Sequence, residues 1–349
     1  MFHLNRGHVK ILLVISLLAC VQNTAAQRYI TDFDSTIFIT DTLRPLVRRF
    51  ENLHLSGYIQ PQFQVAEAKG ASSFAGGNFP EFVSNRFMLR RARIKLDYRL
   101  PGKDGAPPAI FSFQFEATER DVNVRDMFIR VFEPSKNNFS LTAGLFGRPF
   151  GFEVNLSSAF RETPERGRMS QTLMPSERDL GAMLTYEPQR NVKNKGVVKF
   201  DIGVFNGQGK SGPAEFDSYK DLISRLTLKP VTLSKQIKLS GGLSLLRGGW
   251  VQATKYKYQM GVNNSTKLFI VDSAITNIGD KAPRQYYGAD VQMIMNSRWG
   301  KTELRAEYWR GKQPGTIATT FNPGVLPTLP TYIRNFDGAF FYFLQNIIN

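Results

Sequence analysis

Apolar and polar residues alternate at every second position along most of this 349-residue chain. In IFSFQFEAT (110–118), for example, phenylalanine alternates with serine, glutamine and glutamate. Successive side chains of a β-strand point to opposite faces, so this period predicts strands with one apolar and one polar face. We find no convincing amphipathic helix beyond the N-terminus. About twelve segments alternate in this way, namely 53–65, 86–100, 110–118, 124–132, 139–146, 180–187, 197–205, 221–229, 236–246, 286–295, 301–310 and 336–346.

The connections between these segments distinguish a membrane protein from a soluble sandwich, which also alternates. With one exception, near 119–123, short and long connections follow one another. Short turns at one end and long loops at the other are typical of outer-membrane barrels. A membrane admits only helices and closed barrels as spanning structures. The sequence therefore predicts an all-β protein, a transmembrane antiparallel β-barrel covering 53–349.

The N-terminus reads as an export signal. Arg6 and Lys10 precede the apolar run ILLVISLLA, and small residues follow it. This order predicts a signal peptide over 1–26, cleaved between Ala26 and Gln27, and a short periplasmic lead over 27–52. A lipoprotein signal acylated at Cys20 is the alternative. Cys20 is the only cysteine, so no disulfide framework is expected.

The exported chain is strongly basic. Without residues 1–26 it keeps 43 basic and 29 acidic side chains, a net charge of +14. In an exported protein we expect small anions and the phosphates of outer-membrane lipids as partners, and no nucleic acid.

The segment RFMLRRARIKLDYRL (86–100) places apolar residues such as Met88 and Ile94 on one parity and cations on the other. Arg90 is the exception on the apolar parity. We expect it near the outer rim, extending toward lipid headgroups. The other parity would face a water-filled lumen as a row spaced by about 7 Å, formed by Arg91, Arg93, Lys95 and Arg99. On later strands the same reasoning assigns to the lumen Arg130, Arg225, Lys229, Lys238 and Arg305.

The third outer connection, about 147–179, is too long to be an idle loop in a compact domain. Phe150, Phe152 and Phe160 favour a packed segment over a disordered one. By position it corresponds to the loop that folds inward and narrows the lumen in general porins. Its predicted constriction residues are Arg148, Arg161, Arg166, Arg168 and Arg178, which alternate with several acids.

Taken together, seven stretches resemble the phosphate-selective outer-membrane porin family, the porin O and P type. They are SGYIQPQF (56–63), RRARIKLDY (90–98), RPFGFE (148–153), PSERDLGAML (175–184), GVFNGQG (203–209), YYGADVQ (286–292) and LRAEYWRGKQPG (304–315). The resemblance implies a sixteen-stranded, homotrimeric channel without a cofactor, whose arginines and lysines pass anions such as phosphate. The planar arginine fork suits phosphate, whereas lysine acts as a point charge. Binding must stay weak enough for the anion to leave.

Two other classes of function compete with a channel. A barrel hydrolase needs a nucleophile beside a base, but His54 is the only histidine of the mature chain and no G-x-S-x-G motif occurs. No histidine-based zinc spacing occurs either, so we expect neither an enzyme nor a metal site. A surface protein that binds a glycan would use Trp250, Trp299 and Trp309, although such residues more often form an interface belt.

The last segment, FDGAFFYFLQNIIN, predicts a strand and the beginning of a turn. Outer-membrane barrels usually finish on an aromatic residue, whereas this chain finishes on asparagine. With the sixteen strands that the resemblance implies, we expect the C-terminus to be incomplete by about four strands. A small closed barrel of twelve strands is the alternative.

Overall fold

The computed structural model describes residues 51–73, 76–102, 106–188, 196–210, 212, 214–298, 300–318 and 328–346. They belong to one compact unit that begins at Glu51. The predicted signal peptide, Cys20, the lead up to residue 50 and Trp299 lie outside the described residues.

The described chain is almost entirely β-structure, which confirms the predicted fold class. Its strands are β1 (Leu53–Val65), β2 (Asn85–Arg99), β3 (Ala109–Ala117), β4 (Val122–Phe132), β5 (Phe139–Gly147), β6 (Arg178–Tyr186), β7 (Val198–Phe205), β8 (Asp221–Thr232), β9 (Ile237–Val251), β10 (Lys257–Asn263), β11 (Thr266–Asp272), β12 (Lys281–Ser297), β13 (Gly300–Gly315) and β14 (Thr331–Asn346). Its helices are short: η2 (Glu153–Asn155), α3 (Arg168–Leu173) and η3 (Ile275–Asn277). No helix of the described chain is long and apolar enough to cross a membrane.

One antiparallel meander forms the wall, which we define as β1–β9 and β12–β14. Each wall strand pairs with the next, and β9 pairs directly with β12. These twelve strands coincide with the twelve predicted segments, apart from a few residues at their ends. Among the described residues β1 pairs with β2 and not with β14, so the wall is open along this seam. These residues therefore do not form the closed twelve-stranded barrel considered above.

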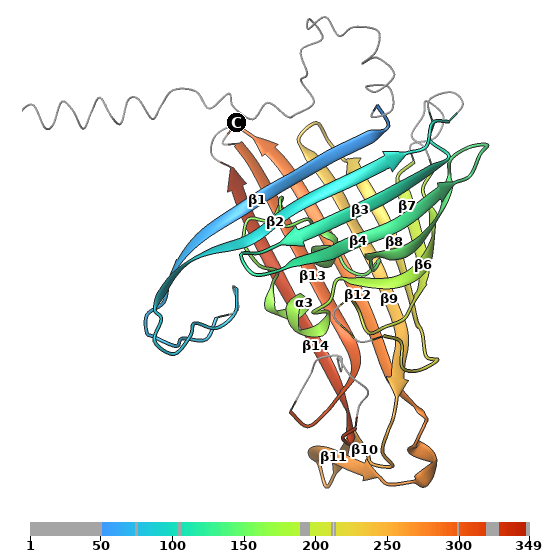
Figure 1. Cartoon of the computed structure of the whole chain (residues 1–349). Coiled ribbons are helices and arrows are strands. Elements are labelled where there is room, and N and C mark those ends of the chain that lie inside the picture. The colour runs from blue at the N-terminus through green and yellow to red at the C-terminus, as the bar shows by residue number, and fades with distance from the viewer. Residues whose placement is uncertain are drawn as a thin grey trace, which may run out of the picture. The chain divides into compact units, whose positions relative to one another are not determined.

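A hairpin, β10–β11, emerges from the connection between β9 and β12 (Figure 1). No strand is predicted between the segments 236–246 and 286–295, so this hairpin is a correction to the sequence analysis. Asn264 and Ser265 have φ of 47° and 66°, and such left-handed residues form the two-residue turns of tight hairpins. The hairpin joins the sheet through a short parallel pairing of β10 with β14. There Tyr258 stacks on Tyr332 with ring centroids 4.4 Å apart.

The wall has its apolar residues on the exposed face and its charges on the buried face. In β8, Leu222 and Leu226 are exposed, whereas Asp221 and Arg225 are buried. The other wall strands repeat the arrangement, with exposed apolar residues that include Leu55, Ile59, Ile94, Leu141, Leu184, Val204, Leu243, Val291, Phe341 and Phe343. A water-soluble core has the opposite order. The alternation in the sequence therefore encodes a sheet whose outer surface is suited to lipid.

A β-bulge corrects the prediction for Arg90. Gln60 pairs with Arg91 and Pro61 pairs with Leu89, so Arg90 is an extra residue in β2. Proline, which lacks an N–H group, is tolerated at such positions. The bulge turns Arg90 inward, where it pairs with Glu165 instead of extending toward lipid.

The same bulge shifts the parity of every residue before it in β2. Met88 pairs with Gln62 on the inner face of β1. Its side chain lies beneath the loop that follows β1, next to Gly76. The assignment of Met88 to the lipid-facing parity is therefore wrong, since period-two counting fails across an inserted residue.

A charge placed on the outer face of β2 tests the orientation of the wall. We expect Ile94→Arg to destabilise the protein by about 2–4 kcal/mol, the cost of arginine near the middle of a bilayer. Lys95→Arg is the matched control, because it places the same side chain one position away on the inner face. The measurement is chemical unfolding in phospholipid vesicles. Equal stabilities for the two variants would contradict the assigned faces.

Candidate constriction site

The connection between β5 and β6, residues 148–177, lies against the inner face of the wall, and we call it the inner loop. It contacts strands that are far apart in the sheet order. Ser158 lies 2.5 Å from the hydroxyl of Tyr58 on β1. Tyr286 on β12 donates a hydrogen bond to the carbonyl of Leu173 at 3.1 Å. Because both flanks of the wall contact one loop, the wall curls around it, and Figure 1 shows α3 in that region.

An apolar cluster fixes the start of the inner loop. Phe150 is fully buried, with its ring centroid 4.9 Å from that of Trp309 and 6.0 Å from that of Tyr286. Both contacts are edge-to-face, a favourable geometry for aromatic pairs. Val154 and Met174 belong to the same cluster. The loop is therefore packed, as its aromatic content predicts.

A continuous set of ion pairs, which we call the ion-pair network, joins the inner loop to β2, β3, β4 and β6. Representative distances are 2.8 Å for Arg91–Glu165 and 3.1 Å for Arg166–Glu177. Its six cations are Arg90, Arg91, Arg93, Arg125, Arg166 and Arg178, and its four carboxylates are Glu116, Asp126, Glu165 and Glu177. The network therefore has two more positive charges than negative ones.

Glu177 is the centre of the ion-pair network. Its carboxylate contacts Arg125, Arg166 and Arg178. Burial alone would raise the pKa of Glu177, but these arginines outweigh it and lower the pKa to about 2. The carboxylate therefore stays ionised at any physiological pH.

Among the described residues, Arg161 is the loop arginine with two buried nitrogens that lack a hydrogen-bond partner, whereas Arg148 has one. The two in Arg161 are Nε and Nη1. Burial lowers the pKa of Arg161 to about 10; Glu177 opposes the shift, and Arg91 and Arg166 add to it. Arg161 is still charged at neutral pH, with two N–H groups left for a ligand or water.

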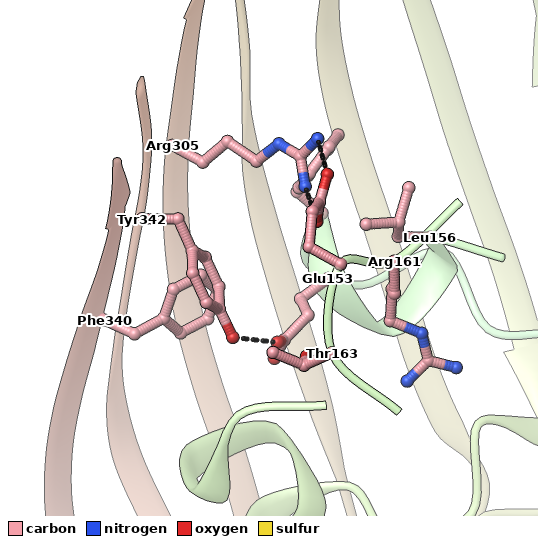
Figure 2. Close-up of a pocket in the computed structure, with 9 residues that line it drawn as sticks. Glu153, Leu156, Arg161, Thr163, Arg305, Phe340 and Tyr342 are labelled. Carbon is pink, nitrogen blue, oxygen red and sulfur yellow. Dashed lines mark hydrogen bonds and ion pairs between the residues drawn. The ribbon is translucent and has the colours of Figure 1, made fainter. Parts of the chain in front are cut away.

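A pocket between the inner loop and strands β13 and β14 lies beside Arg161 (Figure 2). Across it, Arg305 donates to both carboxylate oxygens of Glu162, at 2.9 and 3.0 Å. Figure 2 shows the guanidinium of Arg161 pointing away from that of Arg305. The two cations therefore occupy separate places, one paired and one unpaired.

Most of the cations predicted on the wall have a polar or acidic partner. Arg130 donates to Thr142 at 2.9 Å rather than to a carboxylate. The ion-paired residues are Arg91, Arg93 and Lys95 on β2, Arg225 and Lys229 on β8, and Arg305 on β13. Within the described part of the chain, Arg99 and Lys238 are exposed and have no carboxylate within ion-pair distance. The row on β2 is therefore a mixture of neutralised and free cations.

Of the five arginines predicted in the loop, the structure brings Arg166 and Arg178 together, at Glu177. Arg166 donates to the carbonyls of Met174 and Pro175, at 3.1 and 3.2 Å, and so closes the end of α3. Arg148 is buried and donates to the carbonyl of Ser176. Arg168 is exposed at the start of α3. Arg178 belongs to β6 and the ion-pair network.

The sequence reasoning missed Arg125 and Arg284. In the β3–β4 pairing, Gln114 opposes Asp126 and Phe115 opposes Val124, so Arg125 is the extra residue of a second bulge. Arg284 is buried on β12 beside Asp221, and donates to the carbonyl of Gly207 at 2.7 Å. The sequence signal that could have pointed to such arginines is a nearby acid. Glu116, for example, lies on the polar parity of its strand, where a carboxylate needs a cationic partner.

Comparisons with known proteins find weak structural likenesses, two of them to outer-membrane proteins. No protein-family model and no curated protein matches the sequence. One similar structure is OmpTdeltaL8, a loop-deletion mutant of an outer-membrane protein of Vibrio cholerae, with 11% identity and a TM-score of 0.40; the match covers 75% of this chain and 70% of that one. The other is the outer-membrane channel DcaP of Acinetobacter baumannii, with 12% identity and a TM-score of 0.31, covering 84% of this chain and 97% of that one.

Removing the charge of Glu177 should destabilise the protein in a pH-dependent way. The pKa of Glu177 lies below its ordinary value, so its contribution is complete above about pH 4.5 and is lost as the pH falls through about 2. We expect Glu177→Gln to cost about 3 kcal/mol at pH 7, from the size of that shift. The difference from wild type should disappear toward pH 2 in unfolding measured by tryptophan fluorescence. Glu81→Gln, at an exposed position, is the control, and a pH-independent difference would contradict the assignment.

Proposed function

We propose that this chain forms the wall and constriction of a porin-type channel in a bacterial outer membrane, and that the channel passes small anions in preference to cations. The observation that carries the proposal is the excess of positive charge where the inner loop meets the wall. The ion-pair network holds six arginines and four carboxylates, and Arg161 adds a further cation.

The exposed apolar face supports the membrane location. Soluble monomers rarely expose a continuous apolar surface larger than a few hundred Å². Here apolar residues such as Ile94, Leu226 and Val291 are exposed on strand after strand. Lipid would cover this face, and the charged face would then enclose water.

Arg161 is the side chain best suited to bind a passing anion. A buried N–H group without an acceptor is costly, so an anion or water that accepts a hydrogen bond from Arg161 would be favourable. The guanidinium can donate two parallel hydrogen bonds to an oxyanion such as phosphate. Phosphate is the anion that the sequence resemblance implies, and it enters the proposal on that basis.

The carboxylates of the ion-pair network keep anion binding weak. Conduction needs binding that is favourable enough for entry and weak enough for exit. Glu165 and Glu177 neutralise part of the positive charge around Arg161. The remaining attraction would select anions without trapping them.

The two competing functions find less support in the placement of their residues. Trp309 and Trp250 are buried, so neither side chain offers a ring to a glycan. His54 lies exposed on β1, and no hydrogen bond to it from a nucleophile occurs among the described residues. Enzymatic activity is therefore no part of the proposal. The homotrimer implied by the resemblance would be tested by cross-linking in detergent.

Replacing Arg161 tests the proposed anion selectivity. We expect Arg161→Gln to lower the permeability ratio of anions to cations several-fold in a planar bilayer, because it removes an unpaired charge. Stability should change little, since no partner is left behind. Arg120→Gln is the control, because that side chain is largely exposed in the turn between β3 and β4.

A contrasting result is expected for Arg93, because its carboxylate partner remains. Arg93→Gln leaves Glu116 with less compensation, so it should both shift the reversal potential toward cations and destabilise the protein. The selectivity of both variants is measured from the reversal potential in a salt gradient. An unchanged potential for Arg161→Gln would remove Arg161 from the mechanism, and absence of conductance from the full-length protein would overturn the channel itself.

A further inference from the structure

Glu307 on β13 is a buried carboxylate without a cationic partner. Its side chain is 2% exposed. Oε1 accepts hydrogen bonds from the backbone N–H of Phe152, at 3.0 Å, and from the indole Nε1 of Trp309, at 2.6 Å. Oε2 accepts the backbone N–H of Glu153, at 3.0 Å. Among the ion pairs of the described residues, none includes Glu307, and two of its three hydrogen bonds come from the inner loop.

The backbone of the inner loop is shaped to reach this carboxylate. Gly151 has φ of +68°, a value that favours glycine. A Cβ atom at this position would lie 2.3 Å from Oε1 of Glu307 and 2.9 Å from the ring of Trp309. The N–H of Gly151 donates to Ser244 on β9 at 3.0 Å. Three successive N–H groups therefore point at the wall, and the second and third of them meet the carboxylate of Glu307.

A second carboxylate continues the connection into the loop. Oε1 of Glu153 accepts the N–H of Gly167 at 2.7 Å and the hydroxyl of Tyr342 at 3.1 Å. Its other oxygen accepts the hydroxyl of Ser170 in α3. Glu307 thus holds residues 152–153, and Glu153 holds the beginning of α3. One side chain on β13 is therefore connected, directly or through Glu153, to both parts of the inner loop.

We propose that Glu307 is the positioning residue of the constriction: it fixes the inner loop across the interior by accepting its backbone N–H groups. A purely local role, filling a polar gap in the wall, would leave the loop in place when Glu307 is replaced. The anchoring stands on the contacts alone. Its effect on ion flow rests on the proposed channel function.

Limited proteolysis of the folded protein in detergent tests the anchoring. Glutamate at position 307 offers two acceptor oxygens to the two loop N–H groups. Glutamine offers only one, and its NH₂ group, which is a donor, would face the other N–H group. We expect Glu307→Gln to increase tryptic cleavage after Arg161 and Arg168 by about tenfold or more, because one of the two acceptor oxygens is lost and a buried N–H is left unpaired. Peptide mass spectrometry locates the cuts.

Two further variants complete the test. Asp97→Asn is the matched control, because Asp97 is an inward carboxylate that bonds Lys95 and Ser112 of the wall and not the inner loop. Gly151→Ala perturbs the same anchor from the loop side and leaves the wall sequence unchanged. It should reproduce the cleavage pattern even where Glu307→Gln fails to fold.

The outcomes separate the anchor from the channel. Faster loop cleavage in Glu307→Gln or Gly151→Ala, with intact strands and an unchanged Asp97→Asn, supports the anchor. Wild-type cleavage rates in the folded variants would overturn it. Loop release that leaves single-channel conductance unchanged would support the anchor and refute the constriction assigned to the inner loop under the proposed function.

Discussion

Pairing between arginines and carboxylates on the inner face is the interaction on which the rest of the structure depends. An inside-out sheet encloses charges, and a buried charge without compensation costs several kcal/mol. Glu177 alone contacts three arginines, and Glu116 links β2 to β4 through Arg93 and Arg125. Loss of one partner would leave a charge behind, so the inner loop and the wall stabilise each other.

Two β-bulges make this pairing possible. A regular strand presents only every second residue to the interior, whereas a bulge inserts one extra residue. Arg90 is the inserted residue of β2 and Arg125 that of β4. Each one pairs with a carboxylate of the inner loop, Glu165 or Glu177. The wall thereby places two arginines near the loop in addition to those on its inward parity. These two are one source of the excess of arginines over carboxylates in the ion-pair network.

The sequence predicts the wall strands well, since each is encoded by its own alternation. It predicts the site less well, because a bulge depends on the register between two strands, as at Arg90. The partners of Glu307 cannot be predicted locally: its parity with Arg305 favours an ion pair between them, whereas the structure pairs Arg305 with Glu162 and Glu303. The β10–β11 hairpin was also missed. Its turn residues, Asn264 and Ser265, lie in the long connection between the segments 236–246 and 286–295, where no strand was predicted.

The inner loop uses carboxylates in two different ways, and the difference bears on ion passage. Glu165 and Glu177 pair with arginines, so an anion that approaches those arginines competes with them. Glu307 bonds backbone N–H groups and Trp309 at a site closed to solvent. In the proposed channel, a passing anion would compete with the first kind of contact, whereas the second kind is buried. In the proposed channel, the contacts of Glu307 would therefore persist while an anion competes for the arginines, so one attachment of the inner loop does not depend on the charges that would attract the ion.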